Sequence, residues 1–442
     1  MADKARSSDP AVQAQLDRLT LLSPGRDILG LERISQLLDR LGNPQDRLPP
    51  VFHVAGTNGK GSTCAMLRAM LEAAGHRVHV YSSPHLCRFN ERIRLAARLI
   101  DDAALAPLLA EVLSVADGIS PSFFEVTTAA ALLAFARTPA DACVIEVGLG
   151  GRLDATNVLR TPLVTAIAQL GIDHQAFLGK TIDIIAGEKA GIAKRGRPLV
   201  TLAYPPALTT VIAETARTLG AEWQPRGQDW DAQTSGGQLH YRDAHGAISL
   251  PLPALAGPHQ ADNAALAIAM LRHQDQLAVP VEAMAQGLAA VRWPARLQPL
   301  APGPLRDLLP RHATLWLDGA HNPTAAAAVA DHCRRALATG QPLHLITGLL
   351  ANKDPDGVLA PFAGLALSLT AVPVPDHDHH APATLATKAA ALGLAAHAAP
   401  DVDTALRRLA SRLTPDSQPL VLIMGSLYLA GVVLDANRQW PD

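Results

Sequence analysis

The feature that most constrains the fold is a glycine-rich segment at residues 53–63, which reads HVAGTNGKGST. A short apolar run over 51–55 leads into it, and a run with helical periodicity over 62–74 follows it and ends at Gly75. Glycines permit the backbone conformations of a tight turn, and the amide groups at a helix start attract anions. The segment therefore predicts a phosphate-binding loop between a buried strand and a helix, with nucleotide binding as the first hypothesis.

The loop departs from the Walker A pattern at two positions. Val54 stands where that pattern has its first glycine, and Gly61 stands where it has Ser or Thr. The hydroxyl groups come one step later, at Ser62 and Thr63. A glycine-rich turn without a ligand is the alternative, but strand, loop, Lys60 and helix together favour a nucleotide site.

Composition narrows the class of partner. A chain of 442 residues has room for two or three domains, and 48% hydrophobic residues indicate a folded globular protein. The formal net charge of −2 and the interspersed charges give no sign of a nucleic-acid groove or a polybasic membrane surface, so small-molecule partners are expected. Four scattered cysteines and a polar start without an apolar leader or spanning run predict a cytoplasmic protein.

Alternating strand-like and helix-like segments predict an α/β fold with a mostly parallel sheet. Strands are expected at 51–55, 77–83, 142–147, 163–170 and 198–204, with a hairpin at 238–243 and 248–252. Helices are expected at 9–22, 29–41, 62–74, 101–116, 124–137, 260–273 and 281–290.

A domain boundary is expected at 291–297, where a helix ends and prolines crowd the next segment. The prediction is a phosphate-loop domain at 1–295 and a smaller Rossmann-like α/β domain at 296–442. The second domain has expected strands at 314–317, 343–347, 366–372 and 419–424, and helices at 324–338, 383–392 and 403–413. Because ligands of open α/β sheets bind at the carboxyl ends of strands, the two domains are expected to share a cleft.

Polar side chains follow three of the expected strands in the first domain. Ser83, Glu146 and His174 come at or after strand ends, where they could converge on one Mg²⁺ ion. The alternatives are a surface Glu at a strand end and a His that caps a turn.

A lysine and a second strand end carry further candidate chemistry. Lys189, in the segment EKAGI at 188–192, is either a cationic clamp or, if carbamylated by CO₂, a carboxylate ligand. Asp318 and His321 follow the first strand of the second domain, where Asp318 could bind a ribose hydroxyl; helix capping is the alternative. The segment PDHDHH at 375–380 is interpreted as a loop rather than a metal site, because adjacent side chains diverge.

Together, the segments at 53–63, 82–94, 145–157, 171–174, 188–192 and 317–323 resemble the bacterial folylpolyglutamate synthase/dihydrofolate synthase family of the Mur ligase superfamily. The resemblance implies a P-loop Mur-ligase-like domain followed by a glutamate-ligase domain. It implies ATP contacts from Asn58, Gly59, Lys60, Gly61, Ser62, Asn263, Arg296, Asp318 and His321. It implies metal ligands Ser83, Glu146 and His174, and pterin or folate contacts from Ser122, Phe123, Phe124, Glu125, Leu153, Asp154 and Ala155.

The activity that the resemblance implies is ATP-dependent ligation of L-glutamate to dihydropteroate and to reduced folates, through an acyl phosphate. Lys60, His174 and an N6-carboxylated Lys189 would take the catalytic roles, with ATP, Mg²⁺ at two sites and no organic prosthetic group. A cytoplasmic monomer with both activities is favoured. A monofunctional member is the nearest alternative, and a P-loop ATPase or switch module acting on a protein partner is a more distant one.

Overall fold

The computed structural model describes residues 5–22, 29–414 and 417–442. Its backbone divides into two compact units. The first unit comprises residues 1–254, 260–292 and Asp442, and the second comprises 255–259 and 293–441. The change of unit after Arg292 falls within the expected boundary segment at 291–297.

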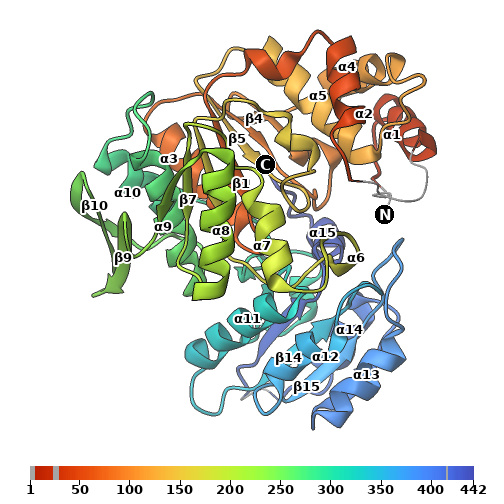
Figure 1. Cartoon of the computed structure of the whole chain (residues 1–442). Helices are drawn as coiled ribbons and strands as arrows, with labels where there is room; N and C mark the ends of the chain where they lie inside the picture. Colours follow the sequence, from red (N-terminus) through yellow and green to blue (C-terminus); the bar gives the residue numbers. More distant parts are fainter. Residues whose placement is uncertain (1–4, 23–28, 415–416) are drawn as a thin grey trace. The chain divides into compact units, whose positions relative to one another are not determined.

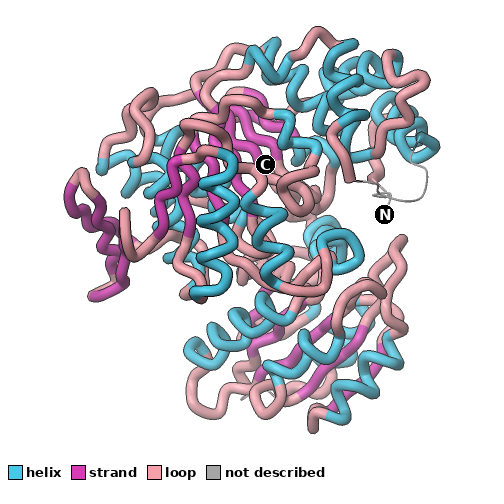
Figure 2. The backbone as a smooth tube through the Cα atoms, in the orientation of Figure 1, coloured by secondary structure: helices cyan, strands magenta, loops and turns pink. Residues whose placement is uncertain are grey.

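The first unit is built on an eight-stranded sheet with the order β4-β3-β2-β5-β1-β6-β7-β8 (Figures 1 and 2). All neighbours from β2 to β8 are parallel, while β3 and β4 form an antiparallel edge. The strands are β1 Val51–Ala55, β2 Val78–Tyr81, β3 Ile93–Leu95, β4 Arg98–Leu99, β5 Ala142–Glu146, β6 Val164–Ile167, β7 Pro198–Thr201 and β8 Glu222–Pro225. The mostly parallel α/β prediction is confirmed.

Helices cover both faces of this sheet, which explains why β1 and β5 are buried along their whole length and apolar except at His53 and Glu146. The helices are α1 Pro10–Leu22, α2 Glu32–Arg40, α3 Lys60–Ala73, α4 Asp102–Ser114, α5 Phe123–Arg137, α6 Gln175–Leu178, α7 Ile182–Ala190, α8 Pro206–Leu219, α9 His259–Arg272 and α10 Val281–Ala290. Helices α1, α2, α4 and α5 share a core with Val51, Cys143 and Ile145. Helix α8 was not among the predicted helices.

A small antiparallel sheet belongs to the same unit and consists of β9 Trp230–Ser235, β10 Gln238–Asp243 and β11 Gly246–Pro251. The sequence predicted the β10–β11 hairpin but not β9. Trp230 stacks on Tyr241, with 5.8 Å between their ring centroids. Arg272 of α9 donates to both carboxylate oxygens of Asp243, at 2.7 and 2.6 Å.

The second unit contains a six-stranded sheet with the order β12-β13-β17-β14-β15-β16. Its strands are β12 Gln298–Pro299, β13 Thr314–Leu317, β14 Leu343–Thr347, β15 Ser368–Ala371, β16 Ala395–Ala398 and β17 Leu420–Met424. Its helices are α11 Pro323–Ala336, α12 Pro355–Leu359, α13 Pro382–Ala391, α14 Val402–Ala410 and α15 Leu427–Ala436. Only β12 is antiparallel to its neighbour, so this unit is also a mostly parallel α/β layer.

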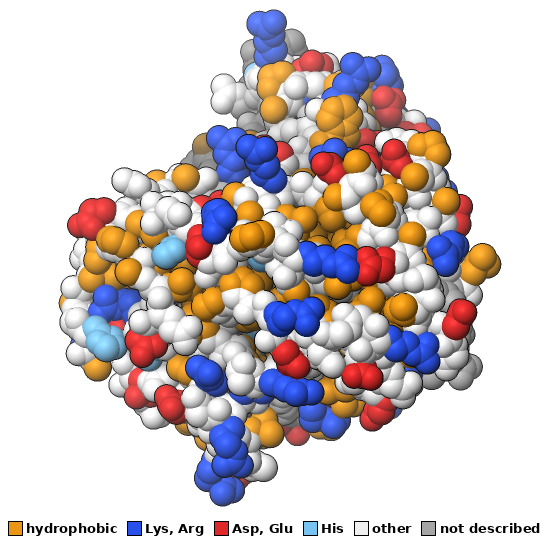
Figure 3. Space-filling model, turned by 90° about the horizontal axis from the view of Figure 1, so that it is seen from above, with side chains coloured by type: hydrophobic (Ala, Val, Ile, Leu, Met, Phe, Trp, Pro, Cys, Tyr) orange, Lys and Arg blue, Asp and Glu red, His pale blue; other side chains and the backbone are white. Residues whose placement is uncertain are grey.

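The surface agrees with the balanced charge of the chain. On the face that Figure 3 shows, basic and acidic side chains alternate with apolar ones. In the ranges that the structure describes, no helix combines the length and apolar character that crossing a membrane requires.

Removing the Arg272 guanidinium is expected to destabilise the first unit. The side chain of Asp243 is fully buried and that of Arg272 is 13% exposed, so Arg272→Met leaves a buried carboxylate without its cationic partner, although the His245 N–H still donates to it. We expect a loss of about 3 kcal/mol in the free energy of unfolding, measured by urea denaturation. Arg407→Met is the matched control, because the Arg407 side chain in the ion pair with Asp403 is 63% exposed. Loss of this pair should lower the free energy of unfolding by less than about 0.5 kcal/mol. Equal losses in the two variants would contradict this view of the buried pair.

Candidate functional site

The phosphate loop joins β1 to α3 and is fixed by hydrogen bonds to the segment after β6. The N–H groups of Thr57 and Asn58 both donate to the carbonyl of Gln169, at 2.8 and 3.1 Å. The Thr57 hydroxyl donates to the Gly171 carbonyl at 2.9 Å and accepts from the Gly171 N–H at 3.1 Å. These contacts hold the loop against the end of the neighbouring strand.

Helix α3 begins at Lys60, directly after Gly59, whose φ of 83° lies in the left-handed region. The first amides of a helix lack intrahelical partners, so this start presents donors to an anion. A Cβ on Gly59 would lie 2.3 Å from Oδ1 of Asn263, which α9 places against the loop. The structure thus brings the Asn263 side chain against Gly59 of the loop.

Two lysines converge on the carbonyl of Gly56. Nζ of Lys60 donates to it at 3.1 Å, and Nζ of Lys189 on α7 donates to it at 3.0 Å. Lys189 is only 4% exposed. Burial, together with the nearby positive charge of Lys60, lowers the pKa of Lys189 to about 7, against a smaller opposing effect of Asp173 and Asp154. The amine is therefore partly neutral near neutral pH.

The proposed metal ligands come from different strand ends. Strands β2 and β5 are neighbours, and the Ser83 N–H donates to Oε2 of Glu146 at 3.4 Å, so these two residues lie together. His174 is exposed, has a φ of 53° and precedes α6, with its N–H bonded to Oδ1 of Asp173 at 2.8 Å.

The donor set suits a hydrated magnesium ion better than a soft metal. The described residues hold no group of three or more His, Cys, Asp or Glu arranged around one point. Mg²⁺ commonly takes one or two carboxylates and keeps waters and phosphate oxygens as its remaining ligands. Glu146 beside a phosphate loop meets that requirement. A closed zinc site would need four protein ligands, and the described residues do not offer such a set.

The residues implied for pterin or folate have two kinds of role. Ser122 and Glu125 form a capping box at the start of α5: Ser122 Oγ accepts from the Glu125 N–H at 3.2 Å, and Glu125 Oε2 accepts from the Ser122 N–H at 2.6 Å. Glu125 also pairs with Arg33 at 3.0 Å. Phe123 lies in the core, whereas Phe124 is half-buried and lies against Gly148. Phe124 is therefore the better placed of these four to meet a ligand.

The loop at 148–157 carries the other three implied pterin contacts. Leu153 is half-buried, while Asp154 and Ala155 are buried. Both oxygens of the Asp154 carboxylate accept hydrogen bonds within the loop. Burial raises the pKa of Asp154. Leu153 is thus accessible to a ligand, and the Asp154 carboxylate organises its own loop.

In the second unit, the carboxylate of Asp318, at the end of β13, also accepts hydrogen bonds from backbone amides. One oxygen accepts from the Leu297 N–H at 2.8 Å and the other from the Ala320 N–H at 2.7 Å. Arg296 donates to the Ala295 carbonyl at 2.8 Å, and Nδ1 of His321 lies 2.8 Å from the Gly319 carbonyl. The structure therefore places Arg296, Asp318 and His321 around one turn.

The histidine-rich segment at 375–380 bonds mainly to backbone. Nε2 of His380 lies 2.9 Å from the Lys353 carbonyl, and Nδ1 of His379 lies 2.7 Å from the His377 carbonyl. The ring of His377 stacks on Tyr428 at 3.9 Å between centroids. This stack was not predictable from a local sequence pattern, because it joins segments about fifty residues apart.

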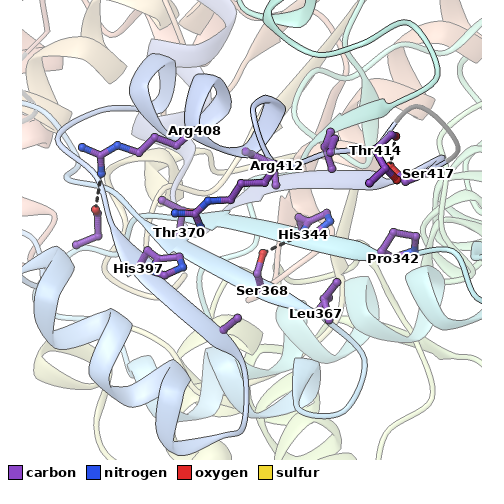
Figure 4. A pocket seen from close by; sticks show the side chains of 14 residues that line it. Pro342, His344, Leu367, Ser368, Thr370, His397, Arg408, Arg412, Thr414 and Ser417 are labelled. Carbon is purple, nitrogen blue, oxygen red and sulfur yellow. Dashed lines mark hydrogen bonds between the residues drawn. The ribbon is translucent and has the colours of Figure 1, made fainter.

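A cavity of about 670 Å³ lies in the second unit, away from every predicted site residue (Figure 4). It lies against the face of the sheet formed by β14, β15 and β16 and is flanked by Arg408 and Arg412. His344 Nδ1 lies 2.7 Å from Ser368 Oγ on its floor. None of the predicted site residues lines this cavity, and Asp318 follows the carboxyl end of β13. Ligands of open α/β sheets bind at carboxyl ends of strands, so we take these strand ends, and not the cavity, as the candidate site.

Sequence reasoning missed several residues that shape the site. Thr57 anchors the phosphate loop through its bonds to Gly171. His53 of β1 and Thr156 form a buried hydrogen bond of 2.8 Å. A buried histidine within an apolar strand was the available signal for His53.

Comparisons with known proteins show which domains the chain contains. The Mur ligase middle domain matches residues 54–271, and the Mur ligase glutamate ligase domain matches residues 307–427. The fold and the phosphate loop therefore define a ligase of the Mur class.

Relatives narrow the assignment. The chain is 38% identical over 333 residues to the dihydrofolate synthase/folylpolyglutamate synthase of Escherichia coli, covering 75% of this chain and 74% of that protein. It is 36% identical to the folylpolyglutamate synthase of Lacticaseibacillus casei, covering 91% and 92%. The structure of E. coli FolC in complex with DHPP and ADP aligns with a TM-score of 0.86 and 32% identity, covering 97% of each chain. The chain belongs to the folylpolyglutamate synthase/dihydrofolate synthase family.

Gly59→Ala is expected to impair nucleotide binding. The new Cβ meets Asn263 and forces a left-handed backbone that alanine resists, so we expect the affinity for ATP to fall about tenfold or more, measured by calorimetry. Gly75, at the other end of α3, has a φ of 88° and open space around it. Gly75→Ala should therefore cost about 1 kcal/mol of stability and leave ATP affinity unchanged. A wild-type affinity in Gly59→Ala would refute the assignment of the loop.

Proposed function

We propose that this chain ligates L-glutamate both to dihydropteroate, giving dihydrofolate, and to tetrahydrofolyl-(poly)glutamates. The observation that carries the proposal is that the amines of Lys60 and Lys189 meet at the Gly56 carbonyl of the phosphate loop. Glu146 and Ser83 lie together at the ends of neighbouring strands. A solved relative is described as a bifunctional enzyme with Mn, AMPPNP and L-glutamate bound; it aligns with a TM-score of 0.85 and 33% identity over 98% of this chain and 99% of that chain.

The chemistry requires activation of a carboxylate. A carboxylate expels oxide poorly, so its oxygen first attacks the γ-phosphorus of ATP, releasing ADP and giving an acyl phosphate. The amine of glutamate then attacks the acyl carbon, phosphate leaves with the C–O bond electrons, and the amine loses a proton. Balanced over both steps, ATP, acid and amine give ADP, phosphate and amide.

The residues of the first unit have separate proposed roles. The loop from Asn58 to Ser62 and the start of α3 hold the phosphates, and Lys60 stabilises charge on the transferring phosphoryl group. Glu146, Ser83 and His174 would hold Mg²⁺, which supplies charge neutralisation of the phosphates when bound. A second magnesium site would involve Lys189. Phe124 and Leu153 present apolar surface for the pterin ring.

Arg296, Asp318 and His321 are proposed nucleotide contacts in the second unit, along with Asn263 in the first. Asp318 would act chiefly by fixing the turn that carries Arg296, since both of its oxygens hold backbone amides. We further propose a cytoplasmic monomer without nucleic-acid or membrane partners.

Lys189 is proposed to be N6-carboxylated in the active enzyme. Carbamate formation needs a neutral amine, which attacks the carbon of CO₂ and then loses a proton. A buried lysine with a pKa of about 7 supplies that neutral amine, whereas an ordinary lysine is almost fully protonated. The resulting carboxylate would replace a cation beside Lys60 with an anion.

Two-acceptor turnover tests the central proposal. We expect ATP-dependent phosphate release with L-glutamate and either dihydropteroate or tetrahydrofolate, and none when glutamate is omitted. Glu146→Gln should reduce both rates at least about a hundredfold, because it removes a metal ligand. Turnover with one acceptor alone would establish the monofunctional alternative. ATP turnover that is independent of any pterin or folate would favour the ATPase or switch reading instead.

Labelling with ¹³C-bicarbonate tests Lys189. We expect a carbamate resonance in the NMR spectrum that grows from pH 6 to pH 8, because the neutral fraction of an amine with a pKa of about 7 rises from about one tenth to about nine tenths. Lys189→Arg should lose the resonance and at least about tenfold in activity. Lys194→Arg is the control, since burial lowers the pKa of Lys194 as well, and it should keep the resonance. A signal that survives in Lys189→Arg would rule out this site.

A further inference from the structure

The loop at 148–157 contacts most parts of the proposed site in the first unit. It follows Glu146, and three glycines let it pass its neighbours closely. A Cβ on Gly148 would lie 2.3 Å from Phe124, one on Gly150 would lie 2.8 Å from Leu178 of α6, and one on Gly151 would lie 2.6 Å from the Glu188 carbonyl of α7. The position of this loop therefore affects the surroundings of the metal ligands, the pterin surface and Lys189 together.

Asp154 closes the loop from inside. Its Oδ1 accepts from the Thr156 N–H at 3.0 Å and from the Thr156 hydroxyl at 2.5 Å, while its Oδ2 accepts from the Leu149 N–H at 2.8 Å. The carboxylate thus bonds residues near both ends of the loop. Asp154 is 2% exposed, so water does not replace these contacts easily.

His53 connects this closed loop to β1. Its Nε2 lies 2.8 Å from Oγ1 of Thr156. Because the single hydroxyl hydrogen of Thr156 goes to Asp154, Nε2 of His53 must donate, which fixes the ring as the Nε2–H tautomer. Burial, with a smaller effect of Lys194, lowers the pKa of His53 to about 3, so the ring is neutral at physiological pH. His53 stands two residues before Ala55, the last residue of the strand that enters the phosphate loop.

We propose that His53 and Thr156 are positioning residues. The hydrogen-bond chain from His53 through Thr156 to Asp154 joins loop 148–157 to β1, so the pterin-facing loop and the phosphate loop keep a fixed relative position. The identity of the acceptor in this inference rests on the proposed function. The effect is on placement of the acceptor and not on binding of ATP, because Thr156 and Asp154 lie in the loop that carries Leu153, whereas the phosphate loop keeps its own hydrogen bonds to Gln169 and Gly171.

Thr156→Val tests the chain by removing the hydroxyl with little change of shape. We expect the KM for dihydropteroate to rise about tenfold, with the KM for ATP within about twofold of wild type, because two buried groups lose their partner. Thr156→Ser keeps the hydroxyl and should restore the acceptor KM. His53→Phe breaks the same bond from the other end, should give the same rise, and serves if Thr156→Val does not fold.

His79→Phe is the matched control. His79 is also fully buried on the same sheet, in β2, but its Nε2 bonds the Thr138 carbonyl at 2.9 Å and its ring stacks on Phe135. This variant should lose stability while keeping the acceptor KM of the wild type. An equal rise of KM in His79→Phe would show a general stability effect and overturn the proposal.

Hydrogen exchange separates this inference from the proposed function. In the ligand-free protein, the amides of Leu149 and Thr156 should exchange about tenfold faster in Thr156→Val than in wild type, because their acceptor is no longer held. If wild type does not ligate glutamate to a pterin or folate, the proposed function fails, and this measurement still tests the connection. Unchanged exchange at both amides would overturn the inference whatever the activity.

Discussion

The hydrogen bonds between the phosphate loop and the segment after β6 determine the rest of the first unit's site. By binding Thr57 and Asn58 to Gln169 and Gly171, they set the direction of the Gly56 carbonyl. That carbonyl is the acceptor on which Lys60 and Lys189 meet. Burial is the larger cause of the lowered pKa of Lys189, and the positive charge of Lys60 at the same acceptor lowers it further. The backbone contact explains why the two amines lie close together, and the buried position of Lys189 explains most of its lowered pKa.

The sequence predicted elements well where they are long, apolar and buried. The bounds of β1 and β14 agree with the expected ranges, because runs that are buried along their whole length have little freedom once both faces of a sheet are covered. The sequence did not predict β16, whose four residues are mostly exposed and include three alanines, or β9, whose second half is exposed. Edge strands depend on a neighbour for their pairing, and that neighbour is not visible in a local pattern.

The site shows the same limit. Positions that follow directly from strand ends, such as Glu146, were predictable, and so was the proximity of Ser83 from a neighbouring strand. The partners of Asp318 were not, because one of its acceptor bonds reaches an amide 21 residues earlier in the chain. The Ser122 and Glu125 pair follows the capping-box spacing, so its structural role could have been recognised from sequence. A polar side chain at the end of a strand can be hydrogen-bonded to backbone amides and so be less available to a ligand. Only the three-dimensional structure shows whether this is the case.

The three close glycine contacts of loop 148–157 restrict how this enzyme can acquire a new acceptor preference. A side chain at Gly148, Gly150 or Gly151 would collide with Phe124, α6 or α7, so substitutions at these three positions would displace the loop or its neighbours. In the proposed acceptor site, changes in the shape of the bound ring would instead be matched at Phe124 and Leu153, which are half-buried. Acceptor preference would then change through these two side chains, while the backbone of the loop stays constant.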